Sequence, residues 1–359
     1  MRVHNFSAGP CTLPLEVLEE ARQEFVDYHG AGMSLIEMSH RSSAYDQVHH
    51  EAMDLARSVF GAPDDFDVLF IGGGATLQFA MIPLNLLGAG RRGAYADTGE
   101  WASRALEDGA FCGDVYAAWE GEEHGYLRTP TDAELRIEDN TRYLHITTNE
   151  TIGGIRYPDF PDVGVPLVGD MSSEYMSRPI PWDRFDVVYG GAQKNLGPAG
   201  VDITFVRRSI LAETNRDLAA YLRFDVHASK DSMFNTPPVF AIYMVGKVLR
   251  WVAGQGGVEV MQANASAKSG RIYRAIDAPG GFYRCPVEVR SRSHMNVVFR
   301  LPSEDLEARF ILEAAGRGLV NLKGHRSVGG VRASIYNAMP EEGVVELVDF
   351  MEEFRAAHG

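Results

Sequence analysis

Between residues 14 and about 210, short apolar runs alternate with amphipathic stretches, and few folds accommodate such a pattern. Short runs rich in β-branched residues predict buried strands, whereas apolar residues every three to four positions predict helices. Strands that alternate with helices are typical of an α/β fold with a mostly parallel sheet. The expected strands lie at 67–71, 93–96, 142–147, 167–169, 187–189 and 203–206, and the clearest helices at 15–28, 44–60 and 75–87.

The rest of the chain has a different order of elements. A long apolar helix is expected at 241–252, and another helix follows Gly256 and Gly257. Two strands, a helix, a strand and a closing helix are then expected at 282–288, 295–300, 306–316, 331–335 and 343–356. This order is typical of a small α+β domain. We therefore predict a large domain over residues 1–255 and a small domain over residues 256–359.

The charge and hydropathy of the chain disfavour two classes of partner. Asp and Glu number 49 against 34 Lys and Arg, which gives a net charge of −15. Such a surface repels phosphate backbones and anionic lipid, so neither nucleic acid nor a membrane is expected as a partner. No apolar run reaches the roughly 18–20 residues that span a bilayer. The nearest candidate, 240–252, carries Lys247 and Arg250.

Cysteine usage and the N-terminus predict a cytoplasmic protein. Cys11, Cys112 and Cys285 show no C-x-x-C spacing, so we expect neither a disulfide framework nor a cysteine-based zinc site. The first residues lack the apolar stretch of a secretory signal. No bound metal is predicted.

Two familiar motifs are present only in part. Residues 88–93 match the G-x-G-x-x-G pattern, but they follow a predicted helix and precede a strand, which reverses the order that dinucleotide binding requires. His50 and Glu51 begin a zinc-helix pattern, but Asp54 stands where the second His is needed. We interpret the first as a turn and the second as a solvated helix face.

Three consecutive glycines, Gly72 to Gly74, join the strand at 67–71 to the helix at 75–87. Glycines at this place let the backbone approach a ligand, and the free N–H groups of a helix start suit a phosphate. A plain tight turn is the alternative interpretation.

Asp170 and Lys194 form the most informative pair of residues. Asp170 ends a predicted strand, and Lys194 lies in a glycine-rich bend between two strands. A lysine with a lowered pKa can form a Schiff base, and a carboxylate at a neighbouring strand end can pair with the ring nitrogen of pyridoxal phosphate. Such a pair is often only structural. The functional interpretation gains support from the glycine loop and from Trp101, an aromatic side chain able to stack on the ring.

Two basic segments interrupt the acidic chain. One holds His40 and Arg41, and the other runs from Lys323 through His325 to Arg332. Arginine suits bidentate capture of a carboxylate or phosphate, so both segments are candidate anion sites. Ordinary surface charge is the alternative, and sequence spacing does not show whether the segments meet.

Seven segments of the chain resemble the phosphoserine aminotransferase family, within the fold-type I, pyridoxal-phosphate-dependent class V aminotransferases. These segments are 5–10, 38–42, 72–79, 149–154, 190–195, 235–238 and 322–337. The resemblance runs nearly end to end. It implies a large domain with a mostly parallel sheet of about seven strands, a smaller α+β domain, and an N-terminal segment, 1–14, that contributes to the active site.

The resemblance also implies roles for individual residues. Lys194 would hold pyridoxal phosphate as a Schiff base, and Asp170 would pair with the ring nitrogen. The remaining cofactor contacts would be Ala75, Thr76, Trp101, Thr151 and Gln193, with Asn235 and Thr236 reaching across from the partner subunit of a homodimer. The anionic substrates would be held by His40, Arg41, His325 and Arg332.

The activity that the resemblance implies is reversible amino transfer in serine biosynthesis. Glutamate and 3-phosphohydroxypyruvate would give 2-oxoglutarate and O-phospho-L-serine. Some bacterial relatives also act on a four-carbon phosphorylated substrate, 4-phosphohydroxythreonine, in pyridoxine biosynthesis.

Three other functions remain as alternatives. A cysteine desulfurase would need a nucleophilic cysteine on a mobile loop, whereas Cys285 lies in a strand-like segment. An alanine–glyoxylate type of transaminase would not need two additional basic clusters. A non-enzymatic phosphate- or metabolite-binding protein is the third alternative.

Overall fold

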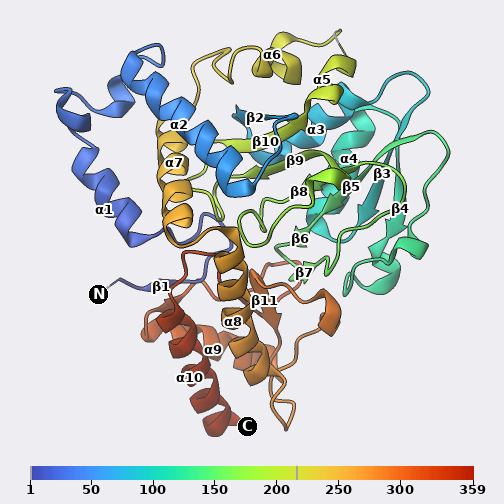
Figure 1. Ribbon diagram of the computed structural model, residues 1–359. Helices are drawn as coiled ribbons and strands as arrows, with labels where there is room; N and C mark the ends of the chain where they lie inside the picture. The colour runs from blue at the N-terminus through green and yellow to red at the C-terminus, as the bar shows by residue number, and fades with distance from the viewer. Residues whose placement is uncertain (1, 216) are drawn as a thin grey trace.

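A mixed seven-stranded sheet forms the centre of the larger part of the molecule in the computed structural model, which describes residues 2–215 and 217–359 (Figure 1). The strands in spatial order are β2 (Phe66–Ile71), β10 (Asp202–Arg207), β9 (Phe185–Gly191), β8 (Leu167–Asp170), β5 (Thr141–Thr147), β3 (Arg92–Asp97) and β4 (Val115–Glu120). β10 runs antiparallel to both of its neighbours, and the other strands share one direction. The predicted α/β fold with a mostly parallel sheet is confirmed.

Helices cover both faces of this sheet. α2 (Ser43–Phe60) and α7 (Val239–Gly254) pack together over one face, and α1 (Leu15–Glu24) lies against α7. α3 (Gly74–Leu86) and α4 (Glu100–Cys112) cover the other face. Phe70 of β2 belongs to the first apolar layer and its neighbour Leu69 to the second. Because both faces are buried, the strands are apolar along most of their length. Two short helices, α5 (Arg208–Glu213) and α6 (Phe224–Ala228), follow β10.

The ends of α2 show how local sequence sets the boundaries of an element. The Ser42 side chain accepts a hydrogen bond of 3.3 Å from the N–H of Tyr45 and caps the helix start. Gly61 ends the helix in the left-handed conformation, with φ 60°, which glycine adopts without a steric penalty.

The C-terminal part forms a second, smaller layer of helices and strands in the lower half of Figure 1. Its elements are α8 (Val258–Ile276), β11 (Asn296–Phe299), α9 (Glu304–Gly316), β12 (Leu319–Val320), β13 (Val331–Ser334) and α10 (Glu341–His358). β11 pairs with β13 in antiparallel register. The N-terminal strand β1 (His4–Asn5) pairs in parallel with β12, and Phe6 is buried in the same apolar core as Phe310. The first residues of the chain therefore pack with its last hundred, while the division near residue 255 stays a prediction.

Three local expectations differ from the structure. The strand expected at 282–288 is wrong, because only a single bridge joins Arg284 to Arg300, and Pro286 has no N–H to extend a ladder. The helix expected at 15–28 ends at Glu24. The edge strand β4 had not been predicted, because its two alanines weaken the strand signal.

Two further sequence interpretations concern a turn and the absence of a membrane span. Residues 88–91 form a turn, closed by a 3.2 Å hydrogen bond from the N–H of Arg91 to the carbonyl of Gly88, as interpreted from the sequence. Within the described residues, no helix combines the length and apolar character needed to cross a bilayer.

Candidate active site

Seven of the nine predicted cofactor residues meet where several strands end at one edge of the sheet. Asp170 is the last residue of β8, and Lys194 lies in the turn between β9 and β10. Because β5, β8 and β9 are parallel, their carboxyl ends lie side by side, the usual position of a ligand in such sheets. The cavity at this edge is lined by Gly73, Gly74, Ala75, Thr76, Trp101, Thr147, Asn149, Thr151, Asp170, Ser172, Ser173, Gln193 and Lys194.

Lys194 is buried at the bottom of this cavity. Its Nζ donates hydrogen bonds to the hydroxyls of Thr151 (2.7 Å) and Ser173 (2.6 Å). It also lies 5.7 Å from the centre of the Trp101 ring. Burial lowers the pKa of the Lys194 amine to about 8, because the charged form loses its hydration. A substantial neutral fraction at neutral to mildly alkaline pH makes this amine a competent nucleophile.

Asp170 is buried beside the lysine. Its Oδ1 accepts hydrogen bonds from the backbone N–H (2.9 Å) and the hydroxyl (2.6 Å) of Ser172. Burial raises the pKa of Asp170, while the nearby charge of Lys194 and the two bonds from Ser172 favour the carboxylate. A carboxylate in this position can pair with a protonated ring nitrogen.

The polar groups left over around the cavity fit pyridoxal phosphate. Trp101 Nε1 and Thr147 Oγ1 are buried and have no hydrogen-bond partner among the described residues, although buried polar groups are normally bonded. No side chain caps the start of α3, whose N-cap is Gly73, and its first turn holds no acidic residue. Its free N–H groups suit a phosphate. An amine, a carboxylate, an aromatic face and an anion site thus surround one cavity.

The N-terminal segment packs against the turn that holds Lys194. The N–H of Cys11 donates to the carbonyl of Gln193 over 3.1 Å, and its Sγ lies 2.5 Å from the carbonyl of Lys194. Burial raises the pKa of the Cys11 thiol to about 12, so this cysteine is an inert packing group.

The predicted substrate residues lie on separate segments of the chain. Arg332, in β13, directs a guanidinium N–H towards the carbonyl of Thr151 at 3.4 Å, and burial lowers its pKa. His325 lies in the preceding loop, where its Nδ1 is 2.8 Å from the hydroxyl of Ser327. His40 and Arg41 lie in a turn before α2, and Arg41 is exposed.

Six predicted residues do not line this cavity of their own chain. They are the four substrate residues, His40, Arg41, His325 and Arg332, and the two cofactor residues Asn235 and Thr236. Asn235 and Thr236 are exposed in the loop before α7. Their assignment to a site shared with a partner subunit stays a prediction.

Ser172, Ser173 and Glu150 are site residues that sequence reasoning did not assign. The two serines follow Asp170 directly, so their proximity to a strand end was the available signal. Glu150 precedes Thr151, but nothing in the sequence indicates which distant group its carboxylate contacts.

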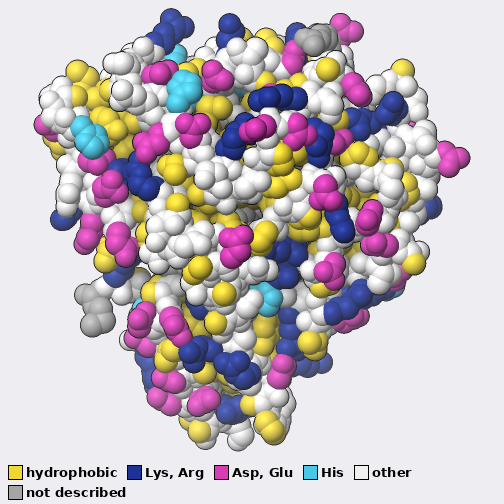
Figure 2. Space-filling model, in the orientation of Figure 1, with side chains coloured by type: hydrophobic (Ala, Val, Ile, Leu, Met, Phe, Trp, Pro, Cys, Tyr) yellow, Lys and Arg dark blue, Asp and Glu magenta, His cyan; other side chains and the backbone are white. Residues whose placement is uncertain are grey.

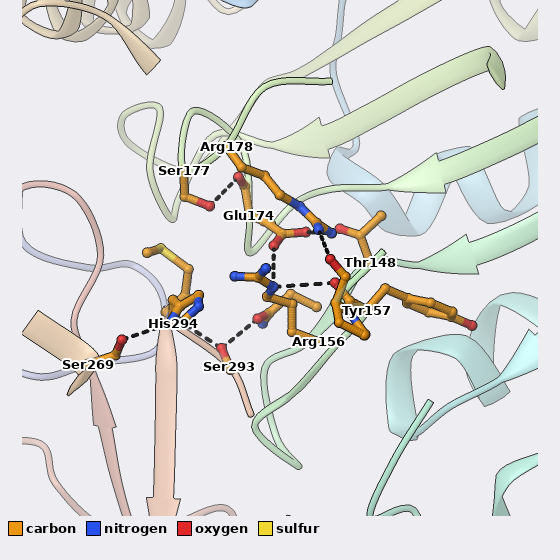
Figure 3. Close-up of polar contacts among 12 residues, drawn as sticks. Thr148, Arg156, Tyr157, Glu174, Ser177, Arg178, Ser269, Ser293 and His294 are labelled. Carbon is orange, nitrogen blue, oxygen red and sulfur yellow. Dashed lines mark hydrogen bonds and ion pairs between the residues drawn. The ribbon is translucent and has the colours of Figure 1, made fainter. Parts of the chain in front are cut away.

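Ion pairs anchor the loop that carries the two serines (Figure 3). The buried carboxylate of Glu174 lies 2.8 Å from a guanidinium nitrogen of Arg178 and 3.4 Å from one of Arg156. Arg156 belongs to β7 (Ile155–Arg156), which pairs with β6 (Asn149–Glu150). The Glu174 carboxylate therefore ties the loop after β8 to the segment that holds Thr151.

His294 connects this region to the C-terminal part. Its Nδ1 lies 2.7 Å from the hydroxyl of Ser269 in α8 (Figure 3). The neighbouring Ser293 hydroxyl donates over 2.5 Å to the side-chain oxygen of Asn149. Burial, together with the positive charges of Arg156 and Arg178, lowers the pKa of His294 to about 4.

The low pKa of His294 predicts a loss of stability in acid. The native state keeps this imidazole neutral, whereas the unfolded chain takes up a proton below about pH 6.5, so its contribution is lost as the pH falls from about 6.5 to about 4. The free energy of unfolding of the wild type should decrease over this pH range, and we expect His294→Asn to make that decrease smaller by up to roughly 3 kcal/mol. Urea unfolding at pH 7, 5.5 and 4.5 measures the free energy of unfolding of both proteins. His29→Gln, which alters an exposed histidine, is the control, and parallel curves for His294→Asn and the wild type would contradict the assignment.

The chain matches known aminotransferases over nearly its whole length. The family model described as aminotransferase class-V matches residues 3–347. A phosphoserine aminotransferase of Niallia circulans is 51% identical over 359 residues, covering 100% of this chain and 99% of the relative. A phosphoserine aminotransferase structure from Bacillus circulans subsp. alkalophilus, also 51% identical, superposes with a TM-score of 0.97 over 100% of this chain and 99% of the other. A PLP-bound phosphoserine aminotransferase from Trichomonas vaginalis is 35% identical, with a TM-score of 0.93 over 98% and 100% of the two chains.

Proposed function

The chain belongs to the phosphoserine aminotransferase family of class-V aminotransferases, and from this premise we propose that it interconverts glutamate and 3-phosphohydroxypyruvate with 2-oxoglutarate and O-phospho-L-serine. The observation that carries the proposal is the buried amine of Lys194 beside Asp170 and the Trp101 ring. This reaction belongs to serine biosynthesis, and we place it in the cytoplasm, in keeping with three free cysteines among the described residues.

We propose pyridoxal phosphate as the cofactor, the group bound in the Trichomonas vaginalis relative. When bound, it supplies an electron sink for the carbanion left after removal of the substrate α-proton. Asp170 would keep its ring nitrogen protonated, and Trp101 would cover the ring. The phosphate would lie at the start of α3 against Ala75 and Thr76, with Gln193 beside it and Asn235 and Thr236 of the partner subunit completing the site.

Lys194 supplies the proton transfer in this proposal. Its Nζ would take the α-proton of the amino acid as a general base and deliver it as a general acid to the aldehyde-derived carbon (C4′) of the cofactor, and the second half-reaction would reverse this transfer. A pKa of about 8 suits both directions near neutral pH. Thr151 and Ser173 hold the amine in place through their hydroxyls.

The anionic ends of the substrates would be held by Arg332 and His325, and by His40 and Arg41. Arg332 is the best supported of these, because its guanidinium points at the backbone of Thr151 beside the cavity. A guanidinium can bind a carboxylate or phosphate through two parallel hydrogen bonds.

We expect Arg332→Ala and His325→Ala to raise the KM for phosphoserine about 10- to 100-fold, because a hydrogen bond to a charged group contributes roughly 1.5–3 kcal/mol. Cofactor affinity should change less than about twofold. Steady-state kinetics and cofactor titration measure the two effects. The control is Arg317→Ala, since the exposed Arg317 side chain pairs with Glu353. An equal loss of cofactor affinity would mean that Arg332 and His325 serve the fold instead.

A coupled assay tests the proposed reaction directly. The holoenzyme is given phosphoserine and 2-oxoglutarate, and glutamate formation is followed, with unphosphorylated serine as the control substrate. We expect turnover of phosphoserine and little of serine; equal rates would contradict the assignment. 4-Phosphohydroxythreonine in the same assay shows whether the pyridoxine-pathway reaction is also catalysed.

We also propose that the enzyme is a homodimer with shared sites. Four exposed apolar side chains lie between the end of α1 and the start of α2, close in sequence to His40 and Arg41: Phe25, Val26, Met33 and Ile36. Figure 2 shows hydrophobic side chains gathered at the corner where Figure 1 places this segment. Such a patch on a soluble surface marks a contact with another chain.

Sedimentation of the holoenzyme measures its assembly. We expect a species of twice the 39.5 kDa chain mass at micromolar concentration. A fully active monomer would refute the shared site.

Two alternative functions have less support. Cys285 is partly buried, and burial raises the pKa of its thiol, which is unfavourable for the nucleophile of a desulfurase. A purely binding protein would not need a buried lysine whose amine is poised beside a carboxylate.

A further inference from the structure

We propose that Glu150 is a positioning residue that fixes Trp101 over the cofactor site. The proposal rests on the proposed function, because it concerns the same pyridoxal phosphate cavity. The carboxyl group of Glu150 contacts neither Lys194 nor Asp170 directly and acts through the backbone of Trp101.

The geometry begins with two hydrogen bonds. Glu150 is the second residue of β6, and its side chain is almost completely buried. Its Oε2 accepts from the backbone N–H of Trp101 (3.2 Å), and its Oε1 accepts from that of Ala102 (2.9 Å). Both N–H groups belong to the first turn of α4, where a helix has no internal acceptors. Glu150 therefore caps the helix that carries Trp101, although it comes from a different strand.

Gly99 makes room for this cap. As the N-cap residue of α4, it has no side chain that could bond the first turn. A Cβ built on Gly99 would lie 2.8 Å from Cδ of Glu150, closer than nonbonded carbons approach. The carboxylate of Glu150 occupies the space that a side chain at position 99 would need. A substitution at Gly99 therefore tests the same contact from a second, independent position.

The neighbouring residue links the cap to the catalytic lysine. Thr151 follows Glu150 and accepts the 2.7 Å hydrogen bond from Lys194. Two consecutive residues thus set the two sides of the cavity: Glu150 holds the helix that carries Trp101, and Thr151 holds the amine. The distance of 5.7 Å between Lys194 Nζ and the Trp101 ring depends on this short segment.

Burying the carboxyl side chain of Glu150 costs free energy, so its presence here needs a physical reason. Burial raises the pKa of Glu150 to about 8, opposed by the N–H groups of Ala102 and Trp101. A glutamine would place an NH2 group opposite one of these N–H donors and lose one bond. In either protonation state both carboxyl oxygens keep lone pairs that can accept from the two backbone donors, whereas the NH2 group of a glutamine cannot, which explains why a carboxyl group is used.

The test compares Glu150→Gln, Glu150→Ala and Gly99→Ala with Glu100→Gln. Glu100 is exposed in the same turn of α4 and serves as the matched control. We expect Glu150→Gln and Gly99→Ala to weaken the affinity of the apo-protein for pyridoxal phosphate about tenfold and to reduce the visible circular dichroism of the bound cofactor. Glu150→Ala should have a larger effect, and Glu100→Gln should stay within about twofold of the wild type.

A double-variant cycle separates positioning from a general effect on the fold. If Glu150 acts through Trp101, Glu150→Gln should change cofactor affinity less than about twofold in a Trp101→Ala background. Equal losses in both backgrounds would overturn the proposal. So would a lowered unfolding midpoint of the apo-protein with unchanged cofactor affinity in both Glu150→Gln and Gly99→Ala. The readout is cofactor binding, so wild-type protein that binds pyridoxal phosphate but does not transaminate phosphoserine would refute only the proposed function.

Discussion

Lys194→Ala is expected to lower the rate of phosphoserine transamination by at least about 10³-fold, because the substitution removes both the amine that would join the cofactor and the group that moves the α-proton. The coupled assay measures the rate, and borohydride reduction followed by mass analysis of the peptide measures the covalent adduct. We expect no reducible adduct at position 194 in the variant.

Two companion variants make this result interpretable. Lys230→Ala changes an exposed lysine and should retain wild-type activity. Lys194→Arg keeps a positive charge near Asp170 but offers no amine that can lose its proton, so it should be as inactive as Lys194→Ala. A Lys194→Ala protein that stays yellow, forms a borohydride-reducible adduct and transaminates would disprove the catalytic assignment.

Glu174→Gln is expected to cost about 3–5 kcal/mol of folding free energy, the usual result of leaving buried charges without their partner. Arg178 and Arg156 both direct guanidinium nitrogens at this carboxylate, at 2.8 Å and 3.4 Å. Urea unfolding measures the loss. Cofactor affinity should also fall, because the same loop carries Ser172 and Ser173.

The matched control for Glu174 is a pair on the surface. Arg309 and Glu313 lie 2.7 Å apart on α9, and both side chains are more than a third exposed. Glu313→Gln should cost no more than about 0.5 kcal/mol, because solvent screens such pairs. If Glu174→Gln costs as little as Glu313→Gln, the loop is held by its backbone contacts and not by the ion pairs.

The sequence was sufficient for the parts of the fold whose signals are local. The strand at 67–71 and the glycines after it were recognisable because a buried run and a helix start are adjacent in the chain. Asp170 and Lys194 were recognisable for a similar reason, since each lies directly at the end of a strand. The edge strand β4 was missed, because its two alanines dilute the strand signal.

Contacts between distant segments were beyond sequence reasoning. The carboxylate of Glu150 caps a helix that starts fifty residues earlier. Ser173 accepts a hydrogen bond from the Lys194 amine, but it lies in an irregular loop whose path no periodic sequence pattern predicts. The basic segments illustrate the same limit. Arg332 reaches the carbonyl of Thr151, a residue that lines the cavity, whereas Arg41 is exposed in a distant segment, and no spacing rule distinguishes the two.

The pairing of β1 with β12 has a consequence for how the protein is made. The strand β1 is translated long before its partner and stays unpaired until residues 319–320 have been made. The residues just after that strand press against the backbone of Gln193 and Lys194. The support behind Lys194 can therefore be completed only after residues 319–320 have been made, so a nascent chain stalled before that point lacks a finished candidate site.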